Sequence, residues 1–393
     1  MKTLRERVDE YNKDVLPFLL EKKYKRMSEN AFSFFRGTCH LFYEDLSGNN
    51  SFSPSPVSWI TGDLHLENFG SYKGDNRLVY FDLNDFNEVL LAPLSWEISR
   101  MITSIFIAFD SLHIDHKEAT KMANHFLKTY SSTLSLGKPR YIEQKITKGI
   151  VRDFLKKVAR RNQNELLDGR VFQKGKNLHL RIDDEHQLKL DKDLENSLAD
   201  FIRDWTRNHL RQYQPMDIAF RIAGTGSIGV KRYVFLLKHL KKEQKYLLLD
   251  MKEATASCVA KFCSKTQPGW ATEAERMFSV QQYMQNNCPA LLTAINFNGK
   301  SFIIKELQPS EDKINFKLIK ERNKDISEVI NDMAVLTASA QLRSAGRRGA
   351  ALPDELIEFG NSEQWQKEIV EFSSDYCGKM KLYYHEFSKQ VSP

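Results

Sequence analysis

A stretch of β-type sequence interrupts a chain that is otherwise patterned mainly for helices, and this order of elements limits the folds open to it. The short runs in this stretch are rich in Val, Tyr, Phe and Leu, which favour strands. Strands are predicted at residues 217–223, 230–237, 246–252, 291–298 and 300–306, with one helix at 271–284. Apolar residues recur at helical spacing on both sides of the stretch. The predicted fold class is therefore α+β, with a β meander enclosed by helical segments.

The length of the chain indicates more than one folding unit. Domains usually contain about 50–250 residues, and this chain has 393. We predict a large, mostly helical lobe from residues 1–213 and a small β-rich lobe from residues 214–310. Residues 311–393 are predicted to be helical and to complete the large lobe.

The helical first part of the chain contains one short region with a different pattern. Residues 8–46 carry charges between apolar side chains at helical spacing, and residues 93–112 and 117–213 continue mostly helical. Between them, residues 68–72 and 78–86 are predicted to form a small hairpin closed by the polar turn KGDNR. The predicted large lobe therefore includes a hairpin as well as helices.

Composition argues against several classes of protein. The five cysteines are scattered and lack zinc-type spacing, which indicates free thiols in a reducing compartment. The first residues contain no apolar core of signal-peptide type, and no run approaches the ~18 apolar residues of a membrane helix. The net charge of +7 is spread out and is not interleaved with aromatic residues, so nucleic-acid binding is not expected. We expect a cytoplasmic protein that does not enter a membrane.

The segment GTGSIG is a candidate phosphate-binding loop. Its glycines also fit the turn of a dinucleotide-binding fold, but that turn must open into a helix. Here VKRYVFLL follows, which favours a strand, so the segment is expected to join two antiparallel strands. Glycine permits the close approach of backbone amides to phosphate groups. The expected phosphate contacts are Gly224, Gly226, Ser227 and Gly229.

A lysine ends the third predicted strand, one hairpin after the glycine segment. Lys252 is expected to reach the α- and β-phosphate oxygens of a nucleotide, and the alternative is a surface lysine with a buried stem. The next helix carries Glu273 and Glu275, and one interpretation is an ion pair between Glu275 and Lys252. A solvated helix face fits both glutamates equally well.

Two acidic motifs precede the β-rich stretch. In GDLHLEN, Asp63 is followed five residues later by Asn68. Phosphoryl transfer needs a carboxylate that accepts the proton of the acceptor hydroxyl, and an oxygen ligand for Mg²⁺ close by. The predicted strand after the turn ends in DLNDF, where Asp82 and Asp85 compete for a second metal position. The alternative for Asp63 is a helix cap or turn residue.

The acidic motifs resemble those of a group of phosphotransferases. TGDLHLEN is similar to the HGDLHxxN motif of aminoglycoside and choline phosphotransferases, with Thr61 in place of the first His. NDFNEVLLAPLSWEIS resembles the IDFDxA…P…WDLA segment that follows there. This resemblance implies a protein-kinase-like fold. It places Asp85 at the metal position and Glu97 where those enzymes carry a structural Asp.

The whole chain resembles a bacterial family designated domain of unknown function 2252. The matching segments are RMSENAFSFFRG, GDLHLENFG, FDLNDFNE, GTGSIG and LDMKEATAS, with weaker matches in LTASAQLRSAG and DYCGKMKLYYHEF. Gln341 stands where a His is expected, and Asn87 where a second acid is expected. In ordinary kinases the glycine loop precedes the catalytic loop, whereas here Asp63 precedes the glycine segment by about 160 residues. Together the resemblances imply a kinase-like fold with circularly permuted motif order.

These residues predict an ATP- and Mg²⁺-dependent phosphotransferase that acts on the hydroxyl group of an unidentified small molecule or protein. Lys252 and the glycine segment would hold the phosphates, and Asp63 would orient and deprotonate the acceptor hydroxyl. The metal ligands would be Asn68 with Asp85 or Asp82. Adenine is expected near Glu306, in the segment ELQP. The alternatives are nucleotidyl (AMP) transfer on the same scaffold and a catalytically inactive nucleotide-binding regulator.

Overall fold

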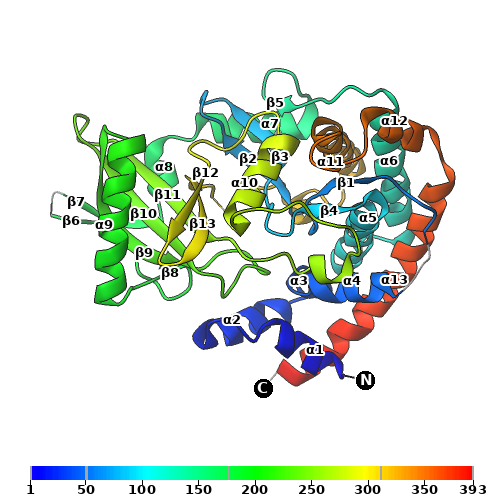
Figure 1. The fold of residues 1–393 in the computed structure, drawn as a ribbon, viewed down its shortest axis with the longest axis horizontal. Coiled ribbons are helices and arrows are strands. Elements are labelled where there is room, and N and C mark those ends of the chain that lie inside the picture. The colour runs from blue at the N-terminus through cyan, green and yellow to red at the C-terminus, as the bar shows by residue number, and fades with distance from the viewer. Residues whose placement is uncertain (1, 49–51, 176, 310–311, 392–393) are drawn as a thin grey trace.

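Helices dominate both ends of the chain in the computed structural model, and strands are concentrated in its middle (Figure 1). The structure describes residues 2–48, 52–175, 177–309 and 312–391. The helices are α1 (Leu4–Tyr11), α2 (Pro17–Met27), α3 (Ala31–Gly37), α4 (Cys39–Ser47), α5 (Leu94–Ser111), α6 (His116–Ser135), α7 (Gly149–Arg160), α8 (Gln163–Leu167), α9 (Lys192–His209), α10 (Glu273–Met284), α11 (Asn323–Ser344), α12 (Pro353–Asn361) and α13 (Gln364–Val391). The strands are β1 (Val57–Ile60), β2 (Phe69–Lys73), β3 (Val79–Leu83), β4 (Leu90–Pro93), β5 (Ile142–Glu143), β6 (Val171–Lys174), β7 (Asn177–Leu180), β8 (Gln187–Leu188), β9 (Tyr213–Arg221), β10 (Arg232–His239), β11 (Tyr246–Glu253), β12 (Thr293–Phe297) and β13 (Lys300–Glu306). The predicted α+β class is confirmed.

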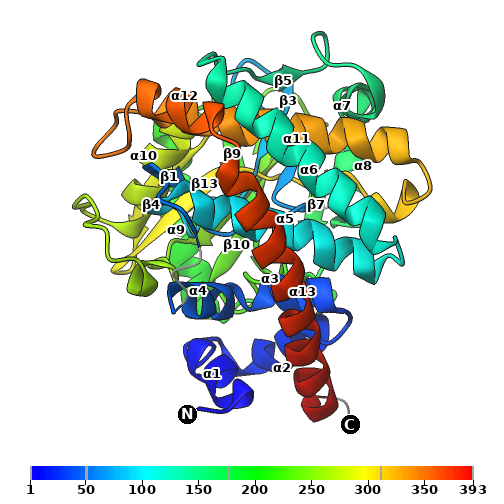
Figure 2. The same cartoon turned by 90° about the vertical axis from the view of Figure 1, so that its right-hand side faces the viewer.

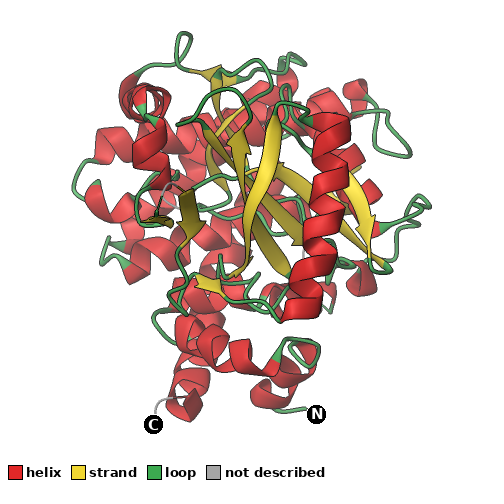
Figure 3. Cartoon of the chain, turned by 90° about the vertical axis from the view of Figure 1, so that its left-hand side faces the viewer, coloured by secondary structure: helices red, strands yellow, loops and turns green. Residues whose placement is uncertain are grey.

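The largest sheet contains six antiparallel strands in the order β12-β13-β11-β10-β9-β8. The five strands predicted between residues 217 and 306 are all present in it. The β12–β13 turn is tight because Asn298 and Gly299 have φ angles of 46° and 72°, which suit a two-residue hairpin loop. Helix α9 lies across one face of the sheet (Figure 3), where Ile202 and Trp205 share an apolar core with Phe235. The sheet therefore has a core of its own.

Helix α5 is the central element of the helical region. Residues on every side of it are buried, and these include the charged residues Glu97 and Arg100. Helices α6 and α13 pack against it, and α11 packs against α6. At the end of α13, the Tyr383 hydroxyl accepts a hydrogen bond of 3.2 Å from Arg7 Nη1, so α1 and the last helix lie side by side (Figure 2). Within the described residues, no helix combines the length and the apolar character needed to cross a membrane.

Two short pairs of strands bring the acidic segments together. The predicted hairpin is confirmed as β2 and β3, in which Phe69 pairs with Leu83. Strand β1 pairs with β4, in which Ile60 lies opposite Leu90. Residues 61–68 and 84–89 each run from one of these pairs to the other. Their ends are therefore fixed side by side, and the two polar segments face each other across a short distance.

The helical stretches differ in detail from the prediction. Residues 8–46 contain four helices, because Pro17 starts α2 and the Asn30 side chain caps α3 by accepting the N–H of Ser33 at 2.8 Å. Residues 117–213 hold helices α6 to α9 but also the β6–β7 hairpin and strand β8. Because β8 pairs with β9 and α9 packs on the sheet, β8 and α9 belong with the sheet although they precede residue 214. The boundary predicted between residues 310 and 311 lies outside the described residues.

Candidate active site

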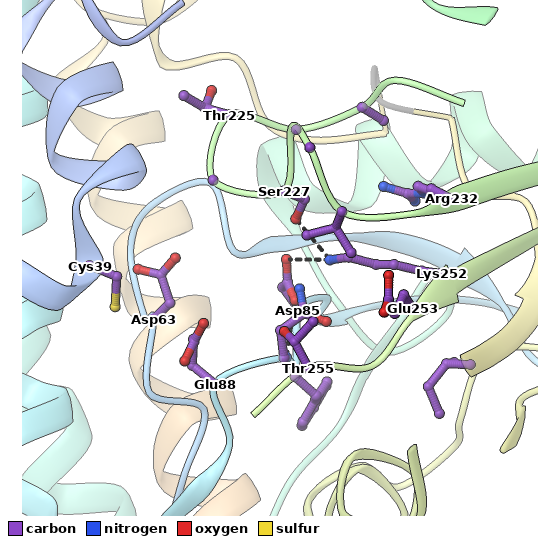
Figure 4. Close-up of a pocket in the computed structure, with 18 of the residues that line it drawn as sticks. Cys39, Asp63, Asp85, Glu88, Thr225, Ser227, Arg232, Lys252, Glu253 and Thr255 are labelled. Atoms are coloured by element: carbon purple, nitrogen blue, oxygen red, sulfur yellow. Dashed lines mark hydrogen bonds and ion pairs between the residues drawn. The ribbon is translucent and has the colours of Figure 1, made fainter. Parts of the chain in front are cut away.

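A cleft of about 810 Å³ is lined on one side by the six-stranded sheet and on the other by the two acidic segments (Figure 4). The loop between β9 and β10, which holds GTGSIG, also lines it, as do residues just before and within α2. Of the predicted site residues, those in the cleft lining are Asp63, Asn68, Asp85, Gly224, Gly226, Ser227, Gly229 and Lys252. Segments far apart in the sequence thus meet in one place.

Asp63 is held in the cleft by a buried arginine. The Arg100 side chain is fully buried, and its Nε lies 2.8 Å from Asp63 Oδ1. Burial raises the pKa of the Asp63 carboxyl above its usual range, and the Arg100 charge opposes that shift. The loop reaches this position through Gly62, whose φ is 77° and whose added Cβ would lie 2.3 Å from the Glu88 carbonyl oxygen. The contact with Arg100 therefore fixes one carboxylate oxygen of Asp63.

Asn68 joins the two acidic segments. Its Oδ1 accepts hydrogen bonds from the N–H groups of Asp85 at 2.7 Å and Asn84 at 3.3 Å. Its Nδ2 donates to the Asp63 carbonyl oxygen at 3.1 Å. Both polar atoms of the amide are thus used within the protein, so Asn68 braces the geometry between Asp63 and Asp85.

Lys252 connects the glycine loop with the acidic segment. Its Nζ donates to Ser227 Oγ at 2.8 Å and lies 3.7 Å from Asp85 Oδ2 (Figure 4). Burial lowers the pKa of Lys252, against the opposing effect of Asp85. Burial also acts to raise the pKa of Asp85, but Lys252 and the Asn87 N–H outweigh it and hold that pKa below its usual value. Asp85 is therefore an ionised carboxylate whose side chain is 49% exposed to the cleft.

The glycine loop depends on conformations that other residues rarely adopt. The φ angles of Gly224 and Gly229 are 77° and 96°. A Cβ at Gly229 would lie 2.2 Å from Val15 Cγ1, because the segment before α2 packs closely on the loop. On the other side of the loop, Lys23 Nζ of α2 donates to the Gly226 carbonyl oxygen at 3.1 Å. Helix α2 and the residues before it therefore hold the loop in place.

Three charged residues of the sheet form a buried network in the cleft wall. The Asp250 carboxylate is 2% exposed and accepts hydrogen bonds from Arg232 Nε at 2.7 Å and Arg221 Nη1 at 3.0 Å. Burial acts to raise the pKa of Asp250, but the two arginines outweigh it and hold that pKa well below its usual range. The network is held together by charge-assisted hydrogen bonds.

Three further amines lie in the cleft wall. Lys23, Lys305 and Lys313 line the cleft, and burial lowers the pKa of each to about 8. A bound anion would favour their charged forms and restore these pKa values toward normal. These amines place positive charge beside the acidic side chains Asp63 and Asp85, which line the same cleft.

Three predicted residues lie away from the cleft lining. The Asp82 carboxylate accepts the N–H of Leu83 at 2.8 Å, and burial raises its pKa to about 6. Glu275 accepts the N–H of Ala271 at 2.8 Å at the start of α10. Glu306 forms an ion pair with Arg77. Lys252 thus contacts Ser227 and Asp85, and the cleft is lined by Asp85 rather than by Asp82.

A buried network supports the Asp63 loop from below. Glu97 is 1% exposed, and its Oε1 accepts the Thr61 hydroxyl at 2.6 Å. Its Oε2 accepts the Gln341 amide at 2.8 Å, and Gln341 in turn accepts the Tyr130 hydroxyl. Burial raises the pKa of Glu97 to about 7. Thr61 and Gln341 are the two positions where His was expected, and both contact the same carboxyl group.

Mg²⁺ binds to oxygen atoms, so the oxygen donors of the cleft determine whether it fits there. Within the described part of the chain, no group of three His, Cys, Asp or Glu side chains lies close enough together to hold a metal ion by itself. Asp85 nevertheless offers a half-exposed carboxylate to the cleft. Mg²⁺ is commonly held by one or two carboxylates together with water and substrate phosphates. The donor set fits Mg²⁺ in that mode.

A family model described as "uncharacterized protein conserved in bacteria (DUF2252)" matches residues 15–390. The chain belongs to this family. No match to this DUF2252 chain was found among curated proteins or among solved structures. The family match covers every element that lines the cleft except the residues before Val15.

Sequence reasoning missed several residues that build the cleft of this DUF2252 chain. Asp250 lies two residues before Lys252 in an otherwise apolar strand, so both side chains point to the same face. That alternation was a usable signal for Asp250. Arg100 likewise lies in the apolar run ISRMITSIFIAF, where a charged side chain requires a buried partner. Lys23 gives no local signal, because only the packing of α2 on the glycine loop brings it to the cleft.

Proposed function

We propose that this chain is an ATP- and Mg²⁺-dependent phosphotransferase with a two-lobed, protein-kinase-like architecture in permuted order. The observation that carries the proposal is the position of Lys252 Nζ, which lies 2.8 Å from Ser227 Oγ and 3.7 Å from Asp85 Oδ2. A glycine loop, a lysine and a carboxylate are the parts that bind the phosphates of ATP in kinases. Here they meet in one cleft that Asp63 also lines.

The nucleotide would lie with its phosphates under the glycine loop. Backbone amides near Gly224 and Gly226 and the Lys252 amine would contact phosphate oxygens, and the sheet arginines add positive charge. The base would lie toward Gln308, where Met277 and Ile303 supply apolar lining. Glu306 precedes this segment but turns to Arg77. Adenine recognition is therefore assigned to the segment that follows Glu306.

The metal would be held by Asp85 together with phosphate oxygens and water. When bound, Mg²⁺ neutralises charge on the transferring phosphoryl group. The amide of Asn68 keeps Asp85 at a fixed distance from the Asp63 loop, because it bonds to both segments. Asn68 thus acts chiefly by positioning, with Asp85 as the metal ligand.

Asp63 would orient the acceptor hydroxyl and take its proton. Arg100 engages Oδ1, which leaves the other oxygen to face the acceptor. Because burial raises the pKa of Asp63, the carboxylate is a stronger base than an exposed aspartate. Replacing Asp63 by Asn should reduce turnover by ~10²–10⁴ while the nucleotide still binds.

The order of the motifs along the chain is the basis for the permuted order. Asp63 and Asp85 precede the glycine loop and Lys252, whereas in ordinary kinases the glycine loop and its lysine come first. In this proposal the chain runs through the large lobe, continues through the small lobe and returns to the large one.

Titration calorimetry with MgATP tests the proposal. Wild type should bind, and Lys252→Ala and Asp85→Ala should each weaken binding by about tenfold or more, which is ~1.4 kcal/mol. Lys238→Ala is the matched control, since Lys238 lies on β10 but does not line the cleft. Absence of binding in wild type, or an affinity in both cleft variants that equals that of wild type, would contradict the proposal.

A second measurement separates phosphoryl transfer from its alternatives. ATP labelled at the γ-phosphate should transfer its label to an acceptor, and ATP labelled at the α-phosphate should not. Transfer of the α-label would instead indicate AMP transfer. Tight binding without transfer of either label, across a broad panel of hydroxyl acceptors, would indicate a regulator.

A further inference from the structure

A second cavity lies on the opposite face of the six-stranded sheet. Its volume is about 360 Å³, which is within the range of small-molecule sites. Neighbouring residues of a strand point to opposite faces, and Arg232 lines the cleft whereas Tyr233 lines this cavity. On β13, Ile303 likewise lines the cleft and Phe302 lines this cavity. The sheet therefore separates most of this cavity from the nucleotide cleft.

The wall of the second cavity is mostly apolar. It is formed by Leu16, Phe18, Leu188, Leu190, Leu194, Phe220, Tyr233, Phe297 and Phe302. These side chains come from the segment that leads into α2, from the start of α9, and from the sheet. Phe18 remains 57% exposed at the cavity. Because protein interiors are close-packed, an apolar hollow of this size with an exposed aromatic side chain indicates a binding site rather than a packing defect.

The polar residues of the cavity are predominantly basic. Lys189, Lys231 and Lys300 line it, and Asp191 is the one acidic residue in its described lining. The Asp191 carboxylate already caps α9 by accepting the N–H of Leu194 at 2.9 Å. Lys300 pairs with Glu253 at 2.6 Å. Within the described part of the chain, neither Lys189 nor Lys231 forms an ion pair with a carboxylate, so both ammonium groups can contact a ligand.

We propose that this cavity binds a small amphipathic anion, that is, a molecule with an apolar body and one carboxylate or phosphate group. The apolar wall would bury the body, and transfer of apolar surface from water drives such binding. Lys189 and Lys231 would contact the anionic group at the edge of the cavity. This proposal does not rest on the proposed phosphotransferase activity, because most of the cavity lining lies on the other face of the sheet. Leu16, Lys231 and Lys300 line both the cavity and the cleft, whereas Lys189 lines the cavity alone.

Calorimetry with decanoate, below its micelle concentration, tests the site on the full chain. Wild type should bind decanoate, and Leu194→Trp, which fills the cavity, should abolish binding. The double variant Lys189→Ala/Lys231→Ala should weaken binding at least tenfold. Lys192→Ala is the matched control and should leave the affinity unchanged, because Lys192 lies on α9 with its side chain 75% exposed and outside the cavity lining.

Two further ligands, decanol and decyl phosphate, test the role of the anionic group. Decanol should bind at least tenfold more weakly than decanoate, and equal binding would overturn the role of the lysines. Decyl phosphate in parallel distinguishes a phosphate from a carboxylate as the preferred group. If Leu194→Trp does not fold by circular dichroism, Leu188→Phe takes its place. Absence of decanoate binding in wild type, or unchanged binding in the folded cavity-filling variant, overturns the site.

Discussion

Replacing Asp250 by Asn removes a charge from the cleft wall and preserves the shape of the side chain. In the folded chain, Asp250 accepts hydrogen bonds from Arg232 at 2.7 Å and Arg221 at 3.0 Å. Asparagine has one acceptor oxygen in place of two and carries no negative charge. Two guanidinium groups would then remain in the wall without their carboxylate.

The expected loss of stability follows from this burial. Removing one partner from a buried ion pair costs about 3–5 kcal/mol. Arg221 and Arg232 are 11% and 15% exposed, so water can solvate them in part. We therefore expect about 3 kcal/mol, which changes the unfolding equilibrium constant by roughly 10². Since the arginines depress the pKa of Asp250, wild type keeps this stabilisation above pH ~3.9 and loses it as the pH falls further.

Urea unfolding measured by tryptophan fluorescence and circular dichroism provides the assay. Trp205 on α9 is 6% exposed and packs with the core of the sheet, so it reports on this region. Asp204→Asn is the matched control, because Asp204 forms an exposed pair with Arg207 on the same helix and should change stability by less than ~1 kcal/mol. A loss below ~1 kcal/mol in Asp250→Asn would refute the reasoning.

Three further predictions concern other parts of the site. Because burial raises the pKa of Glu97 to about 7, wild type should lose about 3 kcal/mol of stability as the pH rises from ~4.5 to 7, and Glu97→Gln should lack this loss in urea titrations at each pH. Gly229→Ala should lower the free energy of unfolding by about 1–3 kcal/mol, measured by thermal unfolding. Adding Val15→Ala to this variant should restore the part of the loss that comes from the clash with Val15. If it restores nothing, the clash with Val15 is refuted. Asn68→Ala should cost about 1–3 kcal/mol by leaving the Asp85 and Asn84 amides without their acceptor, and an unchanged urea midpoint would contradict the bracing role.

The strands were predictable from sequence because their patterns are local. VKRYVFLL and YLLLDMK are dense in residues that favour strands, and the turn at Asn298 and Gly299 has a strong hairpin signature. The β6–β7 hairpin was missed, since each strand has only four residues and half of these residues are exposed. Strand β8 has only two residues and is defined by its pairing with β9. Sequence patterns identify elements that bury their own apolar residues. They miss elements that are defined only by hydrogen bonds to a neighbouring strand.

The site was predictable only where its chemistry lies in short motifs. The acidic motifs and the glycine segment pointed to Asp63, Asp85 and Lys252, and all three line one cleft. The choice between Asp82 and Asp85 depends on which way each side chain faces. Asp82 lies within β3 and Asp85 lies after the strand has ended, so strand alternation does not predict the direction of Asp85. Whether Glu275 pairs with Lys252 depends on the distance between their side chains in the folded chain, and the sequence alone does not give that distance.

The contact between Lys252 and Asp85 also has a consequence for how the protein is made. Asp85 leaves the ribosome 167 residues before Lys252, which at about 5–20 residues per second is a delay of roughly 10–30 s. Helix α13, which packs along α5, is translated after every other described helix. A chain synthesised only as far as α12 therefore exposes the surface of α5 that α13 covers. Folding of the helical region must wait until α13 has been made, so this protein should depend on nascent-chain chaperones more than one whose domains are completed in turn.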